Sequence, residues 1–294
     1  MCEEILTGGR ITASVVRIGD TVHRSPCGNS GFVREVLSHL ERRGADFSPR
    51  WLGVDERGRE VFSFMPGSVP DNIGEFTDGQ CCAAARMIAR MHELLSDMPA
   101  SAPGQTVCHR DLSPCNFTFV QGMPSGIIDW DAAAVGDPRA DLAYAMWMWL
   151  DIGNDERDPA LVARRMRIMR DAYGRFSLEE LYGVMLGEMA RVGRGVFPTE
   201  EQTLATHRWT QACRDWCERR LAGVLPCALG RFKGAMSAAV CQYIGRCHAG
   251  DLCLRERPLS CPGNRRYGAA AICFANCVEM YIHTPGANAH CPAG

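Results

Sequence analysis

Short runs of β-branched residues and one amphipathic segment alternate along the first 66 residues of the chain. Residues 4–24 favour strands, with turns at Gly8-Gly9 and Gly19-Asp20 that separate an extended run at 11–18 from another at 21–24. Apolar residues then recur at helical spacing before Gly44, and residues 51–54 and 60–64 favour a hairpin. This order predicts a small antiparallel sheet that carries one helix.

The pattern becomes mainly helical after residue 66, where a Pro-, Gly- and Asp-rich stretch interrupts it as far as Gly74. Capping boxes predict three helix starts, and the first of these helices runs to about Leu95. The boxes are Thr77 with Gln80, Ser177 with Glu180, and Thr199 with Gln202. Asp137-Pro138 begins another helix that runs through Trp149. We expect the last helix to end near residue 225.

A β-hairpin is predicted inside this helical part, with strands at 117–120 and 126–129 around a turn at 121–125. The fold class is therefore α+β with two lobes. A sheet lobe spans residues 1–66, and a mainly helical lobe spans residues 67–225. Residues 226–294 hold eight of the 16 cysteines and fit neither lobe. We expect a divergent, partly disordered tail there, while the first eight thiols are free and largely buried.

Composition and charge narrow the function. A hydrophobic share of 46% and no apolar run of membrane-spanning length predict a soluble protein, and the acidic start without a signal peptide predicts a cytoplasmic one. Residues 67–225 carry 16 Arg and 22 Asp or Glu, a net charge of −6. That charge suits a cationic small-molecule substrate, or else a solvated acidic surface. No basic stripe with interleaved aromatics indicates nucleic-acid binding.

Three oxygen-bearing residues carry the candidate chemistry. Asp111 and Asn116 follow a short predicted strand at 106–108, and Asp129 ends the predicted hairpin. A positioned carboxylate activates a substrate hydroxyl, while amide and carboxylate oxygens are ligands that Mg²⁺ prefers. Because the feet of a hairpin lie close together, Asn116 and Asp129 are predicted to meet. This arrangement is typical of phosphoryl transfer, with Asp111 as the base and Asn116 and Asp129 as metal ligands.

Residues 5–225 resemble the aminoglycoside phosphotransferase family, small-molecule kinases with a protein-kinase-like fold. The resemblance is carried by His109-Arg110-Asp111 with Asn116, by Ile128-Asp129-Trp130-Asp131, and by Gly136-Asp137-Pro138-Arg139-Ala140-Asp141-Leu142-Ala143. It implies ATP or GTP between the two lobes, Asp111 as the base, and Asn116 and Asp129 as Mg²⁺ ligands. It also implies that Asp141 accepts backbone N–H bonds from the catalytic loop. For Asp137 we prefer the simple role of a helix cap. Asp131 either joins the metal shell through water or faces the substrate.

One departure from the family lies on the third strand, where a lysine usually holds the nucleotide phosphates. The chain has a single lysine, Lys233, and the strand carries His23 and Arg24 instead. Strand alternation places these two on opposite faces, so only one of them serves. Chemistry favours Arg24, which binds phosphate bidentately, while alignment with the family favours position 23. Glu35 is the candidate ion-pair partner, or else a solvated helix residue.

The hinge between the lobes is predicted at 63–66, where Ser63 and Met65 offer backbone groups to the nucleotide base. These features predict a kinase that transfers the γ-phosphoryl group of a Mg²⁺-nucleotide to a hydroxyl of an aminoglycoside-like or other amino-bearing compound. A choline- or homoserine-type metabolite is the alternative acceptor. A catalytically inactive nucleotide-binding pseudokinase is the alternative of another class, and antibiotic resistance is the biological role expected. The sequence does not predict the oligomeric state.

Overall fold

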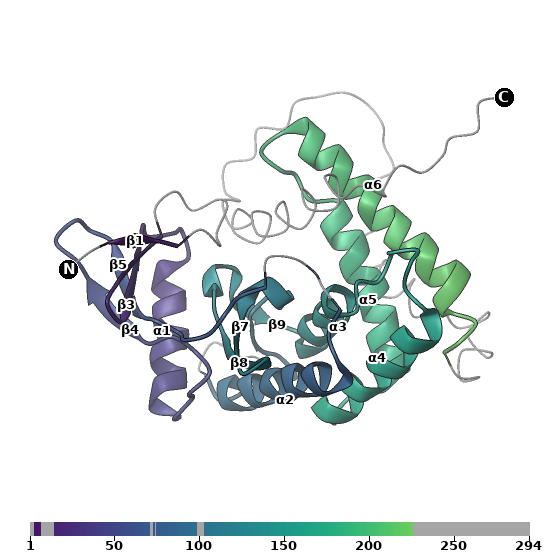
Figure 1. The fold of residues 1–294 in the computed structure, drawn as a ribbon, viewed down its shortest axis with the longest axis horizontal. Coiled ribbons are helices and arrows are strands. Elements are labelled where there is room, and N and C mark those ends of the chain that lie inside the picture. Colours follow the sequence, from purple (N-terminus) through teal and green to yellow (C-terminus); the bar gives the residue numbers. More distant parts are fainter. Residues whose placement is uncertain (1–2, 7–14, 71–72, 74, 99–102, 226–294) are drawn as a thin grey trace.

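The computed structural model describes residues 3–6, 15–70, 73, 75–98 and 103–225 (Figure 1). The predicted tail at 226–294, the Gly8-Gly9 turn and residues 11–14 lie outside the described residues. Figure 1 shows a sheet with helix α1 at one end of the molecule and helices α2 to α6 at the other, with short strands between them. This arrangement is consistent with the boundary that we propose after residue 66.

The N-terminal sheet has five antiparallel strands in the order β1-β2-β3-β5-β4. Their bounds are β1 Glu4–Ile5, β2 Val16–Ile18, β3 Thr21–Arg24, β4 Trp51–Val54 and β5 Glu60–Ser63. The helix α1 (Ser30–Arg42) buries Val33, Val36, Leu37 and Leu40, the stripe that the sequence spacing predicts. Gly44 follows with a φ of 73°, a left-handed conformation that favours glycine after a helix. The predicted order of strands and helix is confirmed.

Five further helices are described beyond the sheet: α2 Asp78–Leu95, α3 Pro138–Trp149, α4 Pro159–Tyr173, α5 Leu178–Gly193 and α6 Glu200–Trp216. All three predicted capping boxes are present, at the starts of α2, α5 and α6. Asp137 caps α3 by accepting a hydrogen bond from the Arg139 N–H, as predicted. The signals above do not delimit α4, which begins where the Asp158 side chain accepts from the Ala160 N–H. A short π-helix, η3 (Cys217–Leu221), is the last helix of the described residues, which continue as a turn to residue 225.

Helix α3 forms the centre of the helical part. All of its residues except Arg139 are buried, including Trp147 and Trp149. Burying a large side chain contributes roughly 1.5–3 kcal/mol to stability. The helix is therefore a firmly held support for the loop that contacts its first turn. The seven described cysteines are free, as predicted, and four of them are buried. Cys2, the eighth thiol of that prediction, lies outside the described residues. Among the described residues, no helix is long and apolar enough to cross a membrane.

Two small antiparallel strand pairs lie between the sheet and the helices. Strand β6 (Thr106–Cys108) pairs with β9 (Ala134–Gly136), and β7 (Phe117–Val120) pairs with β8 (Met123–Ile127). The predicted turn at 121–125 is too long, because strand pairing resumes at Met123. Gln121 and Gly122 have φ values of 51° and 75° and make a tight two-residue turn. Pro124 sits in the strand beside a register shift, a place where a strand tolerates a missing N–H.

Candidate active site

The loop after β6 is held in place by Asp141, near the start of α3. Its two carboxylate oxygens accept the backbone N–H groups of His109 (2.7 Å) and Arg110 (2.9 Å). Arg110 has a φ of 71°, a left-handed conformation that a non-glycine residue keeps only when its surroundings enforce it. These two bonds enforce it, so the predicted bracing role of Asp141 is confirmed.

Asp141 is itself buried and held by a second residue. The His92 ring lies 3.1 Å from a carboxylate oxygen of Asp141 and 2.9 Å from the hydroxyl of Tyr173. Burial is the largest single influence and raises the pKa of Asp141, but the hydrogen bond to His92 and the charges of His92, His109 and Arg110 together outweigh it, so the net pKa is lowered. Asp141 therefore stays ionised near neutral pH. Hydrogen bonds from an ionised acceptor are the stronger kind, which makes the loop anchor firm.

Asp111 follows in this loop and is only 4% exposed. The Tyr144 hydroxyl, one turn along α3 from Asp141, donates to Asp111 Oδ1 at 3.0 Å. The side-chain amide of Asn116 donates to the backbone carbonyl of Asp111 at 2.9 Å. These contacts fix both the carboxylate and the main chain of Asp111. A short 3₁₀ turn, η1 (Pro114–Asn116), then leads directly into β7.

Asn116 and Asp129 lie at the feet of the β7–β8 hairpin. The Ile128 N–H donates to the Asn116 carbonyl at 2.9 Å, which places the residues just before β7 and just after β8 side by side. The His109 ring contacts the Ile128 carbonyl at 3.0 Å and ties the hairpin to the loop of Asp111. Asp129 adopts a left-handed φ of 60° at the start of a second 3₁₀ turn, η2 (Trp130–Ala132). The structure thus brings Asp111, Asn116 and Asp129 to one place.

The site holds an excess of negative charge. The pKa of Asp129 is raised to about 7, first because surrounding protein limits its hydration, and then because the carboxylates of Asp131 and Asp111 repel its charge. The side chain is nevertheless 44% exposed on one side. Arg24 offsets only part of the repulsion. Oxygen donors with uncompensated negative charge are the environment that a hard divalent cation such as Mg²⁺ favours, so the residues fit the expected metal.

Arg24 reaches this site from the sheet. Its guanidinium pairs with Asp131, lies 3.8 Å from Asp129 Oδ1, and stacks over the Phe62 ring at 4.9 Å. Arg24 lies opposite Glu60 in the β3–β5 ladder, on the face that buries Glu60 and Phe62. Burial lowers the pKa of Arg24, but Asp131 and Asp129 outweigh it and the net pKa is raised. The arginine therefore remains charged beside the two carboxylates.

His23 faces the other way. Its ring lies 2.8 Å from an Asp55 carboxylate oxygen and 2.9 Å from the Thr21 hydroxyl, on the opposite side of β3. Glu35 is exposed on α1, and among the described residues it makes no ion pair. Of the two interpretations of Glu35, the structure shows the solvated helix residue and not the ion-pair partner, because Arg24 turns instead to Asp131 and Asp129.

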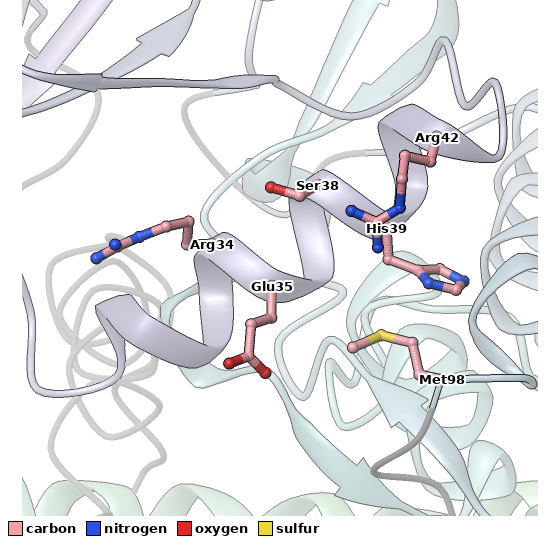
Figure 2. Close-up of a pocket in the computed structure, with 6 residues that line it drawn as sticks. All are labelled: Arg34, Glu35, Ser38, His39, Arg42 and Met98. Atoms are coloured by element: carbon pink, nitrogen blue, oxygen red, sulfur yellow. The ribbon is translucent and has the colours of Figure 1, made fainter.

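Glu35 lines a surface hollow of about 310 Å³ on α1, together with Arg34, Ser38, His39, Arg42 and Met98 (Figure 2). Figure 2 shows the charged ends of Arg34 and Glu35 pointing in different directions, so they do not converge on a common point. A larger hollow of about 640 Å³ lies between α2 and residues 123–125. Neither hollow is lined by Asp111, Asn116 or Asp129.

The two predicted hinge residues differ in what they offer. The Ser63 N–H donates to the Arg50 carbonyl at 2.9 Å, and its hydroxyl accepts from the Arg50 N–H at 2.8 Å. Those groups therefore already have partners inside the protein. Met65 lies beyond the end of β5, and its side chain covers Gly126 in β8, where an added Cβ would come within 2.5 Å of Met65 Cε. Met65 thus joins the hinge to the hairpin that carries Asp129.

Two residues of the site have no signal in the sequence motifs. Tyr144 contacts Asp111, and Asn29 donates hydrogen bonds to the backbone carbonyls of Asp131 and Ala133. Tyr144 lies three residues after Asp141 on α3, so the helix period places both on the side that faces the loop. That spacing was the available clue. Asn29 acts across more than 100 residues and leaves no local pattern.

Comparison with known proteins places this geometry in a family. Residues 93–178 match the model of the phosphotransferase enzyme family, a range that includes Asp111, Asn116, Asp129 and Asp141. The trifolitoxin immunity protein of Rhizobium leguminosarum bv. trifolii is 30% identical over 233 residues, which cover 70% of this chain and 82% of that protein. The chain belongs to the phosphotransferase enzyme family. It is accordingly an enzyme of the kinase type, as the motifs predict.

Comparison with solved structures bears on the fold. A choline kinase from Cryptosporidium parvum Iowa II superposes with a TM-score of 0.52 at 11% identity, covering 82% of this chain and 93% of that one. An aminoglycoside phosphotransferase from Streptomyces rimosus, in complex with ADP and streptomycin, has a TM-score of 0.48 at 16% identity over 62% of this chain and 90% of that one. The choline kinase likeness confirms the predicted two-lobed, kinase-like α+β fold.

Proposed function

We propose that this kinase transfers the γ-phosphoryl group of a Mg²⁺-bound ATP or GTP to a hydroxyl group of a small molecule. The observation that carries the proposal is the meeting of Asp111, Asn116 and Asp129 at the feet of one hairpin, with Arg24 reaching in from the sheet. The loop after β6 supplies Asp111, the β7–β8 hairpin supplies Asn116 and Asp129, and the N-terminal sheet supplies Arg24. Turn formation alone explains Asp111 or Asn116 singly, but it does not explain all three together with a cationic side chain.

Asp111 is the residue that meets the acceptor hydroxyl. The hydrogen bond from Tyr144 holds one carboxylate oxygen in a fixed direction, and Asp141 holds the main chain before it. A fixed carboxylate would orient the hydroxyl toward the γ-phosphorus and receive its proton as the new P–O bond forms, while the bond from that phosphorus to the β–γ bridging oxygen breaks and the nucleoside diphosphate leaves. Positioning of this kind supplies much of the rate in phosphoryl transfer, because the reaction needs little covalent help from the protein.

Asn116 and Asp129 would hold Mg²⁺ through their oxygens. The bound ion would neutralise charge on the phosphates and stabilise the charge that develops in the transition state. The repulsion between Asp129 and its neighbouring carboxylates makes the cation's binding favourable. Asp131, which pairs with Arg24, would either join the metal shell through water or face the substrate.

Arg24 would hold the nucleotide phosphates in place of the family's lysine. Its guanidinium already lies beside the proposed metal ligands, whereas His23 is engaged on the far face with Asp55. A guanidinium offers two parallel N–H donors that match phosphate oxygens. When the nucleotide enters with its cation, Arg24 would move from Asp131 and Asp129 to the phosphates, and the cation would bind the carboxylate that Arg24 leaves. Each charge would therefore keep a partner of opposite sign. At the hinge, Met65 rather than Ser63 is the proposed backbone partner of the base.

The acceptor is proposed to be an amino-bearing antimicrobial compound. The relative's name records immunity to trifolitoxin, which supports a protective role, and the net charge of −6 over residues 67–225 favours a cationic acceptor. The acidic segment at 151–158 offers less unpaired negative charge to an acceptor than its sequence suggests. Asp151 pairs with Arg157, Asp155 pairs with Arg220, and Asp158 caps α4. A choline- or homoserine-type acceptor is the alternative that the same assay separates.

The test is Mg²⁺-dependent nucleotide turnover by the full chain against a panel of aminoglycosides, other hydroxylated amines, choline and homoserine. We expect one class to stimulate turnover and to gain a phosphate by mass spectrometry. Asp111→Ala should lower kcat by at least about 10²-fold while nucleotide binding stays near the wild-type value. Asp171→Ala, which changes a 66% exposed carboxylate on α4, is the matched control. Undiminished transfer by Asp111→Ala would show that another group is the base.

A further inference from the structure

Asn29, just before α1, reaches from the sheet lobe to the loop that carries Asp129. Its side-chain amide donates two hydrogen bonds, to the backbone carbonyls of Asp131 at 3.0 Å and of Ala133 at 2.9 Å. One NH₂ group thus binds the main chain on both sides of Ala132. Both carbonyls belong to the segment that immediately follows the proposed metal ligand, so the contact bears directly on where that ligand sits.

The position of Asn29 makes this use of its side chain unusual. It occupies the N-cap of α1, where asparagine ordinarily accepts a hydrogen bond from the first turn of its own helix. Here the side chain makes no capping hydrogen bond, and the backbone has a φ of −107° and a ψ of 4°. The amide is therefore directed away from the helix that it begins and toward the other lobe.

The helix that carries Asn29 is well anchored. Four apolar side chains of α1 are at most 1% exposed, and Ser30, next to Asn29, donates to the buried carboxylate of Glu60 at 2.8 Å. The Asn29 carbonyl also accepts from Val33 at 3.0 Å, the first turn of the helix. A donor on such a support holds a fixed place relative to the sheet, and therefore relative to Arg24 on β3.

The segment that Asn29 holds needs external support. Asp129 has a φ of 60°, which costs of the order of 1–3 kcal/mol for a residue other than glycine. Inside the C-terminal part, the Trp130 ring N–H bonds to the Ile127 carbonyl and the Ala133 N–H bonds to the Trp130 carbonyl. Asn29 supplies the backbone contacts from the opposite side, and Arg24 supplies the side-chain contact to Asp131.

We propose that Asn29 is a positioning residue of the active site, which holds the metal-binding loop from the nucleotide lobe. It would couple the closure of the two lobes to the placement of Asp129, because a shift of α1 moves the two carbonyls that its amide binds. The inference rests on the proposed role of Asp129 as a metal ligand. Residues that orient a metal ligand typically change metal affinity by about 10–100-fold when they are removed.

Two substitutions separate this role from simple helix capping. Asn29→Ser keeps a favoured N-cap residue but has a hydroxyl too short to reach two carbonyls in the other lobe. Asn29→Gln keeps the amide donor but is a poor N-cap. A positioning role predicts that the serine variant loses function and the glutamine variant keeps more of it. A capping role predicts the reverse order, so the two explanations give opposite results.

The measurement is Mn²⁺ binding to the full chain in the presence of a non-hydrolysable ATP or GTP analogue, by titration calorimetry or electron paramagnetic resonance. We expect Asn29→Ser to weaken Mn²⁺ binding by about tenfold while its melting temperature stays close to that of the wild type. Its KM for Mg²⁺ should rise more than its kcat falls. Ser38→Ala, on the same helix and away from the loop, is the control and should bind Mn²⁺ like the wild type.

The outcomes distinguish the inference from the proposed function. If the wild type binds Mn²⁺, Asp129→Asn abolishes that binding, and Asn29→Ser binds as the wild type does, then the metal site stands and the role of Asn29 is overturned. If the wild type does not bind Mn²⁺ with either analogue, the metal site and the inference are overturned together. If Asn29→Ser does not fold, the glutamine variant decides: Mn²⁺ binding by Asn29→Gln close to that of the wild type supports the proposal, and binding as weak as that of Asp129→Asn overturns it.

Discussion

Replacing Asp141 by asparagine should destabilise the protein far more than its small chemical change suggests. The substitution keeps the shape of the side chain but exchanges one acceptor oxygen for an NH₂ group. Asp141 accepts from the backbone N–H groups of His109 and Arg110 at a site where it is 1% exposed. The variant would leave one of these N–H groups facing a second donor, without water to replace the lost acceptor.

The magnitude follows from the number and type of bonds. A hydrogen bond to a charged group contributes about 1.5–3 kcal/mol, and a buried donor without an acceptor costs about 1–3 kcal/mol. We therefore expect Asp141→Asn to lower the free energy of unfolding by about 3 kcal/mol. Arg110 would also lose the contact that enforces its φ of 71°, so the catalytic loop should relax and kcat should fall.

The assay is urea denaturation at several pH values. The pKa of Asp141 is lowered in the folded protein, so its carboxylate contributes stability above its unfolded pKa of about 3.9, and this contribution is lost as the pH falls through the folded pKa. The difference in free energy of unfolding between wild type and variant should accordingly be largest at neutral pH and become smaller as the pH falls.

Asp137→Asn is the matched control, because it makes the same change at the cap of the same helix, where the side chain is 26% exposed rather than fully buried. Asparagine and aspartate cap helices about equally well, and the partly exposed pair with Arg139 contributes about 1 kcal/mol. A loss at Asp141 no larger than that at Asp137 would refute the argument that the carboxylate anchors the loop.

Two further predictions concern the reacting groups. Tyr144→Phe removes the hydrogen bond to Asp111 and should lower kcat about tenfold, with little change in the KM for nucleotide; steady-state kinetics would contradict this if kcat held while the nucleotide KM rose. Arg24→Met should weaken nucleotide binding by at least about tenfold in a calorimetric titration, whereas His23→Gln should change it less than about threefold, since His23 lies on the opposite face of β3. A larger effect at His23 than at Arg24 would reverse the assignment of the phosphate-binding residue.

Secondary-structure elements are predictable from the sequence where the interactions that form them lie within a few residues of each other. The capping boxes at Thr77, Ser177 and Thr199 each lie within four residues, so the cap and its reciprocal bond are written in one short segment. The apolar stripe of α1 is equally local. Strand β9 is different, because Ala134–Gly136 has no pattern of its own and becomes a strand only by pairing with β6.

The candidate site divides in the same way. The two extended runs at 117–120 and 126–129 predicted a hairpin that brings Asn116 and Asp129 together, and the structure contains that hairpin with a shorter turn. Alternation showed that His23 and Arg24 occupy opposite faces of a strand. Which face is inward depends on the pairing of Arg24 with Glu60 in β5, and this register is set by packing rather than by the strand's own residues.

By itself, the sequence determined the order of the elements, the motif residues and the chemistry that they share, because short spacings along a loop, helix or hairpin fix which atoms lie together. Only the tertiary structure decided that Arg24 faces Asp131 rather than Glu35. It also decided that Tyr144 donates a hydrogen bond to Asp111, and that Asn29 donates one to the backbone after Asp129. These partners lie 33 to 107 residues apart, and they meet because separately formed elements pack against each other. Packing depends on the shapes and charges of whole surfaces, which no local pattern encodes.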